Sequence, residues 1–304
     1  MGYFDIQVNG YAGVDFNSDS LSAASLRSAC EALRRDGVDS ILATIITEHP
    51  DAMVARIGRI AELRNSDPAI AGMIAGIHVE GPFISPRDGF RGAHPLDAVR
   101  KADVDIAGKI FNACKGLLRV FTLAPEQDPE NKVTKFFSTR GVLVSAGHTD
   151  ASREQIAGAI SCGLGMFTHL GNGCPMELPR HDNIIQRALS FAREIWLCFI
   201  ADGVHIPHFV LRNYLELAGE KAIVTTDAMS AAGLGPGRYR LSRWDVVVGG
   251  DGAARSPDDS HLVGSAMPLR TAAGELAGKL GFDQKRIIQL TDVAPREALY
   301  HGRR

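Results

Sequence analysis

Residues 73–82 read MIAGIHVEGP, and this stretch contains the pattern that decides the fold. The apolar run 73–79 is typical of a strand buried on both faces in a parallel sheet. The run ends at the charged Glu80, and the Gly-Pro pair that follows indicates a turn. Other apolar runs in the chain are also followed by a polar side chain.

The chain contains seven further runs that are predicted to be strands. They lie at 4–8, 41–46, 118–123, 142–146, 166–170, 196–201 and 222–226. The segments between them have the longer period of amphipathic helices, as in the stripe Leu26, Cys30 and Leu33. Strands that alternate with helices predict a parallel sheet covered by helices, and eight strands favour a closed (β/α)8 barrel, a TIM-like α/β fold.

The predicted barrel occupies residues 1–304 as one domain, because no linker or internal repeat divides the chain. Residues 235–262 interrupt the alternation of strand and helix. Their pattern predicts a β-hairpin inserted before the last helices.

Composition excludes several classes of function. The chain is 45% hydrophobic and 22% charged, as in ordinary soluble globular proteins. A formal net charge of −2 gives no electrostatic basis for binding nucleic acid or an acidic membrane surface. The five cysteines form no C-x-x-C pair, which favours reduced thiols, and the sequence shows no leader pattern or membrane span. We expect a cytoplasmic protein that binds neither nucleic acid nor membrane.

Polar side chains follow most of the predicted strands, at the barrel end where reactive groups lie. Glu80, His148 and His169 are the ligand types of a catalytic Zn²⁺ or Fe²⁺ site. Such an ion acidifies a water molecule and polarises a carbonyl group. Asp227, after the last predicted strand, could take the proton of the water and pass it to a leaving group. These residues together predict metal-assisted hydrolysis.

Each of these residues also has a structural alternative. Glu80 could cap a turn, and His148 could be a hydrogen-bonded histidine beside the helix caps that follow it. His169 lies inside a predicted apolar strand, where an unpaired imidazole is costly, so a functional role is favoured. The sequence lacks the glycine-rich nucleotide motifs, the zinc-protease helix motif and the serine-hydrolase elbow.

Seven stretches carry a resemblance that covers nearly the whole chain. They are FDIQVNGYAGVDF, GIHVEGPFISPRDGFRGAHP, SAGHTDAS, FTHLGNG, IADGVHI, VTTDAMSAAG and VGSAMPL. In this order they resemble the N-acetylglucosamine-6-phosphate deacetylase family of the amidohydrolase superfamily. The resemblance implies hydrolysis of the N-acetyl group of N-acetylglucosamine 6-phosphate, with one divalent metal ion, Zn or Fe. Two alternatives remain open: an amidohydrolase acting on a different N-acyl sugar or amide, and a catalytically silent barrel that binds a sugar phosphate.

The resemblance also implies catalytic roles for individual residues. Glu80, His148 and His169 match the metal ligands of the family. Asp227 matches the catalytic acid and base. His94, in RGAHP, matches a residue near the acetamido group, where it could stabilise the oxyanion.

The substrate is implied to be a small amino-sugar phosphate. His205, Asn172 and Gly173 match positions that hold the sugar phosphate. Arg180 is matched to an arginine of the family that reaches the phosphate of the neighbouring subunit in a homodimer, although the stretch PMELPRHDN departs from the family's usual sequence.

Residues 4–9 alternate, with Phe4, Ile6 and Val8 on one predicted face and Asp5, Gln7 and Asn9 on the other. Most amidohydrolases carry His-x-His where this chain has Gln7 and Asn9, and they bind a second metal there. Amides are poor transition-metal ligands but good hydrogen-bond partners. We interpret Gln7 and Asn9 as hydrogen-bonding groups around a single-metal site; the alternative is a site that has decayed.

Members of the family also carry segments before the first strand and after the last helix, and these form a small β-sandwich beside the barrel. We expect the sandwich to be absent here, either because the chain is a barrel-only variant or because the gene start and stop are misplaced. Its absence would leave apolar surface for a subunit contact.

Overall fold

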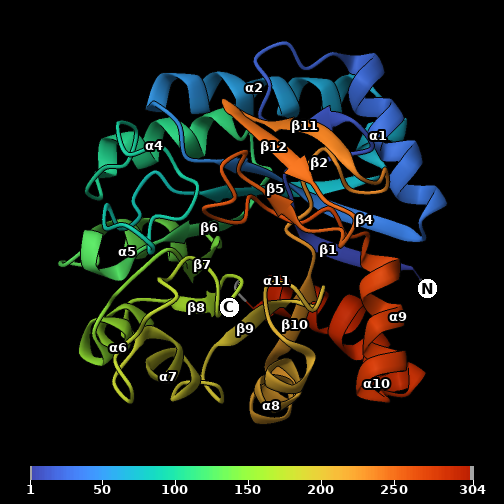
Figure 1. Cartoon of the computed structure of the whole chain (residues 1–304). Coiled ribbons are helices and arrows are strands. Elements are labelled where there is room, and N and C mark those ends of the chain that lie inside the picture. Colours follow the sequence, from blue (N-terminus) through green and yellow to red (C-terminus); the bar gives the residue numbers. More distant parts are fainter. Residues whose placement is uncertain (1, 302–304) are drawn as a thin grey trace.

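The structure, a computed structural model, describes residues 2–301 and has a barrel of parallel strands at its centre (Figure 1). The eight strands pair in the order β1-β4-β5-β6-β7-β8-β9-β10. Their bounds are β1 Tyr3–Val8, β4 Val38–Ile46, β5 Ile74–Glu80, β6 Leu118–Leu123, β7 Leu143–Ala146, β8 Leu164–Phe167, β9 Trp196–Ile200 and β10 Ala222–Thr225. Each predicted strand overlaps one of these, and the predicted (β/α)8 fold is confirmed.

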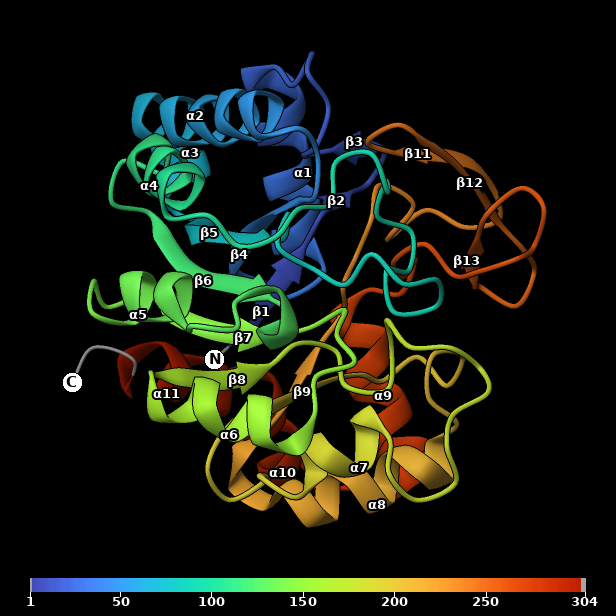
Figure 2. The same cartoon turned by 90° about the vertical axis from the view of Figure 1, so that its left-hand side faces the viewer.

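Helices cover the outside of the sheet (Figure 2). They are α1 Ala23–Arg35, α2 Pro50–Ser66, α3 Pro68–Ala71, α4 Val104–Ala113, α5 Lys132–Ser138, α6 Arg153–Ser161, α7 Ile184–Leu189, α8 His208–Ala218, α9 Leu269–Leu280, α10 Gln284–Ile288 and α11 Ala294–His301. Short turns of helix lie at Pro125–Gln127, Gly219–Lys221 and Gln289–Val293. The stripe Leu26, Cys30 and Leu33 is buried, as its spacing predicts, and Ser22 caps the N-terminus of α1 in a capping box with Ser25.

An apolar cluster packs at the end of the barrel that α11 covers. It contains Phe4 and Ile6 of β1, side chains from the other strands, and Ala294 and Ala298 of α11. Val8 packs in a different cluster, under the helices. The β1–β4 pairing shifts register between Asp5 and Val8, so the strict two-face alternation predicted for residues 4–9 is wrong, because the irregularity changes which way the side chains point.

The sheet closes between β1 and β10 by few contacts. Val8 forms a single parallel bridge with Ala228. The buried carboxylate of Asp5 accepts hydrogen bonds from the hydroxyl groups of Thr225 and Thr226, at 2.5 Å each. Just beyond the strand ends, the backbone N–H groups of Asn9 and Gly10 donate to the Ala228 carbonyl oxygen, at 2.7 and 3.2 Å. The first and last strands are therefore joined by the Asp5 side chain and by a few bonds at their C-terminal ends.

Residues 235–262, predicted as a hairpin, contain a three-stranded antiparallel sheet of β11 Gly237–Leu241, β12 Trp244–Val248 and β13 Ala254–Arg255. This sheet and α11 lie at opposite ends of the barrel (Figure 2). It packs on Ile46 and Met229, at the C-terminal ends of the strands. Two further short strands, β2 Gly10–Tyr11 and β3 Val14–Asp15, pair with each other.

Across residues 2–301, no helix has both the length and the apolar character that a membrane crossing requires.

Candidate metal centre and active site

Three of the predicted site residues share one position relative to their strands. His148, His169 and Asp227 each lie two residues beyond the end of β7, β8 and β10. Their φ angles are 50°, 32° and 54°, in the left-handed region that residues other than glycine rarely adopt. The prediction that His169 lies within a strand is wrong, because β8 ends at Phe167 and the chain turns sharply at the histidine. Such backbone strain persists where surrounding contacts hold it, and it is common at functional sites.

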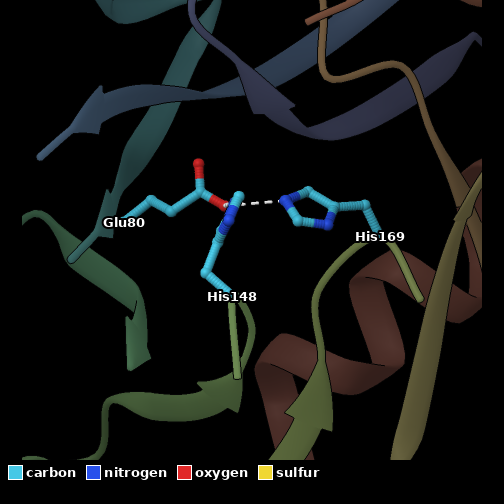
Figure 3. Close-up of side chains that lie close together, drawn as sticks. All are labelled: Glu80, His148 and His169. Atoms are coloured by element: carbon cyan, nitrogen blue, oxygen red, sulfur yellow. Dashed lines mark hydrogen bonds and ion pairs between the residues drawn. The ribbon is translucent and has the colours of Figure 1, made fainter. Parts of the chain in front are cut away.

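The side chains of Glu80, at the end of β5, and of His148 and His169, on the turns after β7 and β8, point toward one another (Figure 3). Glu80 Oε1 lies 2.8 Å from His169 Nε2 and 3.4 Å from His148 Nε2. One donor atom from each residue lies within 4.8 Å of the others, and all three residues are buried. The three residues are far apart in the sequence, and the barrel brings them together as their positions after the predicted strands indicate.

Charge and burial shape the pKa values of the cluster. Burial alone would raise the pKa of Glu80, but hydrogen bonds with His148 and His169 outweigh it and hold that pKa well below its ordinary value. Burial would lower the pKa of His169, yet the Glu80 carboxylate raises it above its ordinary value. The carboxylate therefore attracts positive charge to this point, and a divalent cation would supply that charge in place of a proton.

The surroundings of the cluster fit a metal ion. His148 Nδ1 donates a hydrogen bond to the Phe90 carbonyl oxygen at 3.0 Å, and its Nε2 faces Glu80. This is the usual way in which a ligating histidine is oriented. Gln7 Nε2 donates to Glu80 Oε2 at 3.2 Å and so orients the carboxylate. One carboxylate and two imidazoles form a donor set that suits Zn²⁺ or Fe²⁺.

Asp227 lies beside this cluster with a partner of its own. Asn9 Nδ2 donates to Asp227 Oδ1 at 2.6 Å. Burial first, and the charge of Glu80 second, raise the pKa of Asp227 to about 7. A carboxyl group with such a pKa can both accept and release a proton near neutral pH.

His94 packs edge-on against His148, with the two Nε2 atoms 3.1 Å apart. Burial, and then the neighbouring His148, hold the pKa of His94 well below its ordinary value. The imidazole is therefore neutral, and its Nδ1 has no hydrogen-bond partner within residues 2–301. A neutral imidazole with one N–H can donate to an oxygen on which negative charge develops.

The predicted substrate-binding residues lie on the loops after β8 and β9. Asp202 Oδ2 accepts a hydrogen bond from His205 Nδ1 at 2.7 Å, so that the other ring nitrogen of His205 is oriented. Asn172 Nδ2 donates to the carbonyl oxygen of His169 at 3.1 Å. Arg180 is exposed in the loop between β8 and α7, and its side chain makes no hydrogen bond or ion pair with the described part of the chain.

Gly173 lies against His148 and has a φ of 60°. A Cβ atom at this position would lie 2.7 Å from His148 Nδ1, well inside van der Waals contact. Glycine is required here both for the backbone conformation and for the space that the imidazole occupies.

Glu126, which the sequence analysis did not single out, helps to hold His148 in place. Its carboxylate accepts hydrogen bonds from the hydroxyl of Thr149 and from the backbone N–H of Asp150, the latter at 2.9 Å. These bonds hold the turn that follows His148, and Ser85 N–H donates to the His148 carbonyl oxygen at 2.9 Å. A weaker signal was present, because Glu126 lies three residues beyond the end of the predicted strand 118–123, whereas Glu80 directly follows 73–79.

Comparison with known proteins gives consistent similarities, although no protein-family model matches the chain. The chain is 32% identical over 278 residues to N-acetylglucosamine-6-phosphate deacetylase of Bacillus subtilis, an alignment that covers 90% of this chain and 68% of the relative. It is 30% identical to N-acetylgalactosamine-6-phosphate deacetylase of Escherichia coli O157:H7, with 98% and 74% covered.

A solved structure of a Mycobacterium smegmatis N-acetyl-D-glucosamine-6-phosphate deacetylase variant, bound to N-acetyl-D-glucosamine-6-phosphate, superposes with a TM-score of 0.89 at 27% identity. The superposition covers 98% of this chain and 77% of that one.

Proposed function

The chain belongs to the N-acetylglucosamine-6-phosphate deacetylase family, and from this premise we propose that it hydrolyses the N-acetyl group of N-acetylglucosamine 6-phosphate. The products are glucosamine 6-phosphate and acetate. The observation that carries the proposal is the buried convergence of Glu80, His148 and His169 beside Asp227.

Glu80, His148 and His169 would hold one divalent ion, zinc or iron. When bound, the ion supplies a Lewis acid that polarises the amide carbonyl and makes water a better nucleophile. Gln7 and Asn9 stand where a second metal would need imidazoles, and their amides already bond Glu80 and Asp227. This supports a single-metal site.

Asp227 is the proton carrier of the proposed reaction. Because Asn9 occupies Oδ1, Oδ2 is the oxygen available to take the proton from water. The same oxygen then delivers that proton to the nitrogen of the amide as the C–N bond breaks. His94 would donate a hydrogen bond to the carbonyl oxygen as negative charge develops on it.

The remaining roles concern substrate and assembly. His205, Asn172 and Gly173 would hold the sugar phosphate, and Arg180 would reach the phosphate bound by the neighbouring subunit of a homodimer. The exposure of Arg180 supports this role, because its side chain has no protein partner within residues 2–301. We place the enzyme in the cytoplasm, since the five cysteines are free thiols.

The test is acetate release by purified protein of known metal content. The assay is run with N-acetylglucosamine 6-phosphate and with N-acetylgalactosamine 6-phosphate, because relatives of both specificities resemble the chain. Turnover with about one metal per chain, reduced about 10²- to 10⁴-fold in Asp227→Asn with metal retained, is the expected result. Bound metal without turnover of either epimer would move the proposal to another N-acylated substrate. Protein without metal or turnover would indicate a silent barrel.

A further inference from the structure

A row of buried polar side chains crosses the barrel one level below the metal ligands. It consists of His78 on β5, Thr122 on β6, Ser145 on β7 and Thr168 immediately after β8, and none is more than 1% exposed. We call these four residues the polar row. Layers inside such barrels are normally built from bulky apolar side chains, as in the cluster around Phe4 and Ile6.

Direct hydrogen bonds connect the polar row from end to end. His78 Nδ1 lies 3.0 Å from the Ile6 carbonyl oxygen, and His78 Nε2 lies 2.7 Å from Thr122 Oγ1. Thr122 Oγ1 is 2.8 Å from Thr168 Oγ1, which is 2.6 Å from Ser145 Oγ. The row therefore joins β1, β5, β6 and β7 with the turn after β8.

The donors and acceptors in the row can have only one direction. A carbonyl oxygen only accepts, so Nδ1 of His78 carries the proton, and burial disfavours the charged ring. Nε2 is then an acceptor, and the single hydroxyl proton of Thr122 points to it. Thr168 must in turn donate to Thr122, and Ser145 to Thr168. Because every hydroxyl proton has a fixed acceptor, removing one group leaves a buried partner unsatisfied.

The row coincides with irregularities in the sheet. The pairing of β5 with β6 shifts register between Ile77 and His78, and the pairing of β7 with β8 shifts between Val144 and Ser145. Such shifts interrupt the backbone ladder and re-aim the residues that follow. In both cases the residue just after the shift, His78 or Ser145, is a member of the polar row.

The ligands lie directly above these points. Glu80 follows His78 by two residues, His148 follows Ser145 by three, and His169 follows Thr168. On β1 the carbonyl of Ile6 precedes Gln7, the partner of Glu80. The polar row thus fixes the relative positions of the elements that carry Glu80, His148 and His169.

We propose that His78 and Thr122 are positioning residues, which lock the strand register and so set the separation of Glu80, His148 and His169. This inference rests on the metal centre of the proposed function. It goes beyond it by assigning metal affinity and coordination geometry to side chains that do not touch the metal. If the row were only a satisfied polar core, its loss would lower stability alone.

The test compares Thr122→Val, which keeps the shape and removes the hydroxyl, with Thr122→Ser, which restores it. Val120→Ala, in the apolar layer of the same strand, is the control for lost stability. Zinc affinity is measured by competition with a chelator, and the visible absorption of the Co²⁺-substituted protein reports coordination geometry.

We expect Thr122→Val to bind zinc about tenfold more weakly, or weaker still, and to show an altered Co²⁺ spectrum. Thr122→Ser and Val120→Ala should match the wild type in both. If Thr122→Val does not fold, Ser145→Ala, which detaches only β7, should give a smaller change in the same direction. The inference would be overturned if Thr122→Val, or a folded Ser145→Ala, had the zinc affinity and Co²⁺ spectrum of the wild type. It would also be overturned if Val120→Ala changed both as much as Thr122→Val. Neither result would contradict the proposed function. A wild type that binds no metal would overturn the proposed function together with the inference.

Discussion

Replacing Gly173 by alanine tests whether the loop after β8 holds His148 in place. The new Cβ would lie 2.7 Å from His148 Nδ1, whereas ordinary carbon contacts begin near 3.5 Å. The imidazole would therefore have to move by roughly 0.5–1 Å, which exceeds the tolerance of about 0.5 Å for a functional constellation. The ring cannot move without weakening the bond from Nδ1 to the Phe90 carbonyl.

We expect Gly173→Ala to bind zinc about 10- to 100-fold more weakly than the wild type. The positive φ adds a loss of about 1–2 kcal/mol in the free energy of unfolding. Affinity is measured by chelator competition, and stability of the metal-free protein by urea denaturation.

Gly171→Ala is the matched control, because Gly171 lies in the same loop with a φ of 97°. Its added Cβ would approach Ile206, at 3.4 Å, and not His148. This variant should lose stability and keep its metal affinity. The reasoning would be refuted if Gly173→Ala bound zinc as tightly as Gly171→Ala.

Three further predictions concern the buried polar groups Gln7, Asp5 and Glu48. Gln7→Leu removes the hydrogen bond to Glu80 Oε2 and should weaken zinc binding about tenfold at unchanged stoichiometry, measured by chelator competition; unchanged affinity would contradict the orienting role. Burial raises the pKa of Asp5 above 3.8, so the folded chain keeps a proton that the unfolded chain loses. Stability should then fall by up to about 1.4 kcal/mol per unit as pH rises above about 4, until the folded-state pKa is passed. Asp5→Asn should flatten this part of the curve of unfolding free energy against pH, measured by urea denaturation. An unchanged slope would contradict the assignment of this pH dependence to Asp5. Arg243→Ala leaves the buried Glu48 carboxylate without its closest ion-pair partner and should cost about 1–3 kcal/mol in urea denaturation. Lys115→Ala, which removes an exposed pair with Glu62, should cost less than about 1 kcal/mol, and equal costs would contradict the distinction.

The barrel could be predicted because its signal is local. Each strand is a short apolar run, and the polar residue after it is adjacent in the sequence, as Glu80 is to 73–79. Reactive groups of such barrels lie at the C-terminal ends of the strands. This rule predicted from the sequence that Glu80, His148, His169 and Asp227 lie at the same end of the barrel.

Other features depend on contacts that no local pattern records. The orientation of His148 depends on a backbone carbonyl at residue 90, and a main-chain acceptor has no sequence signature. The polar row arises from single hydroxyl groups on separate elements, each unremarkable in its own segment. The end of β8 was placed too late because Thr168 and Leu170 continue an apolar, β-branched pattern, while the left-handed turn at His169 is imposed by tertiary packing.

The sparsely paired junction between β1 and β10 also determines when, during synthesis, the proposed proton carrier can be positioned. Asn9 and Asp227, which bond across that junction, are 218 residues apart in the chain, whereas Glu80, His148 and His169 all precede β10. During synthesis the ribosome releases all three candidate ligands before it has made Asp227. A nascent chain could therefore gather the strands of the candidate metal site while it still lacks the proposed proton carrier, and the proposed hydrolysis would have to await the docking of the last strand against the first.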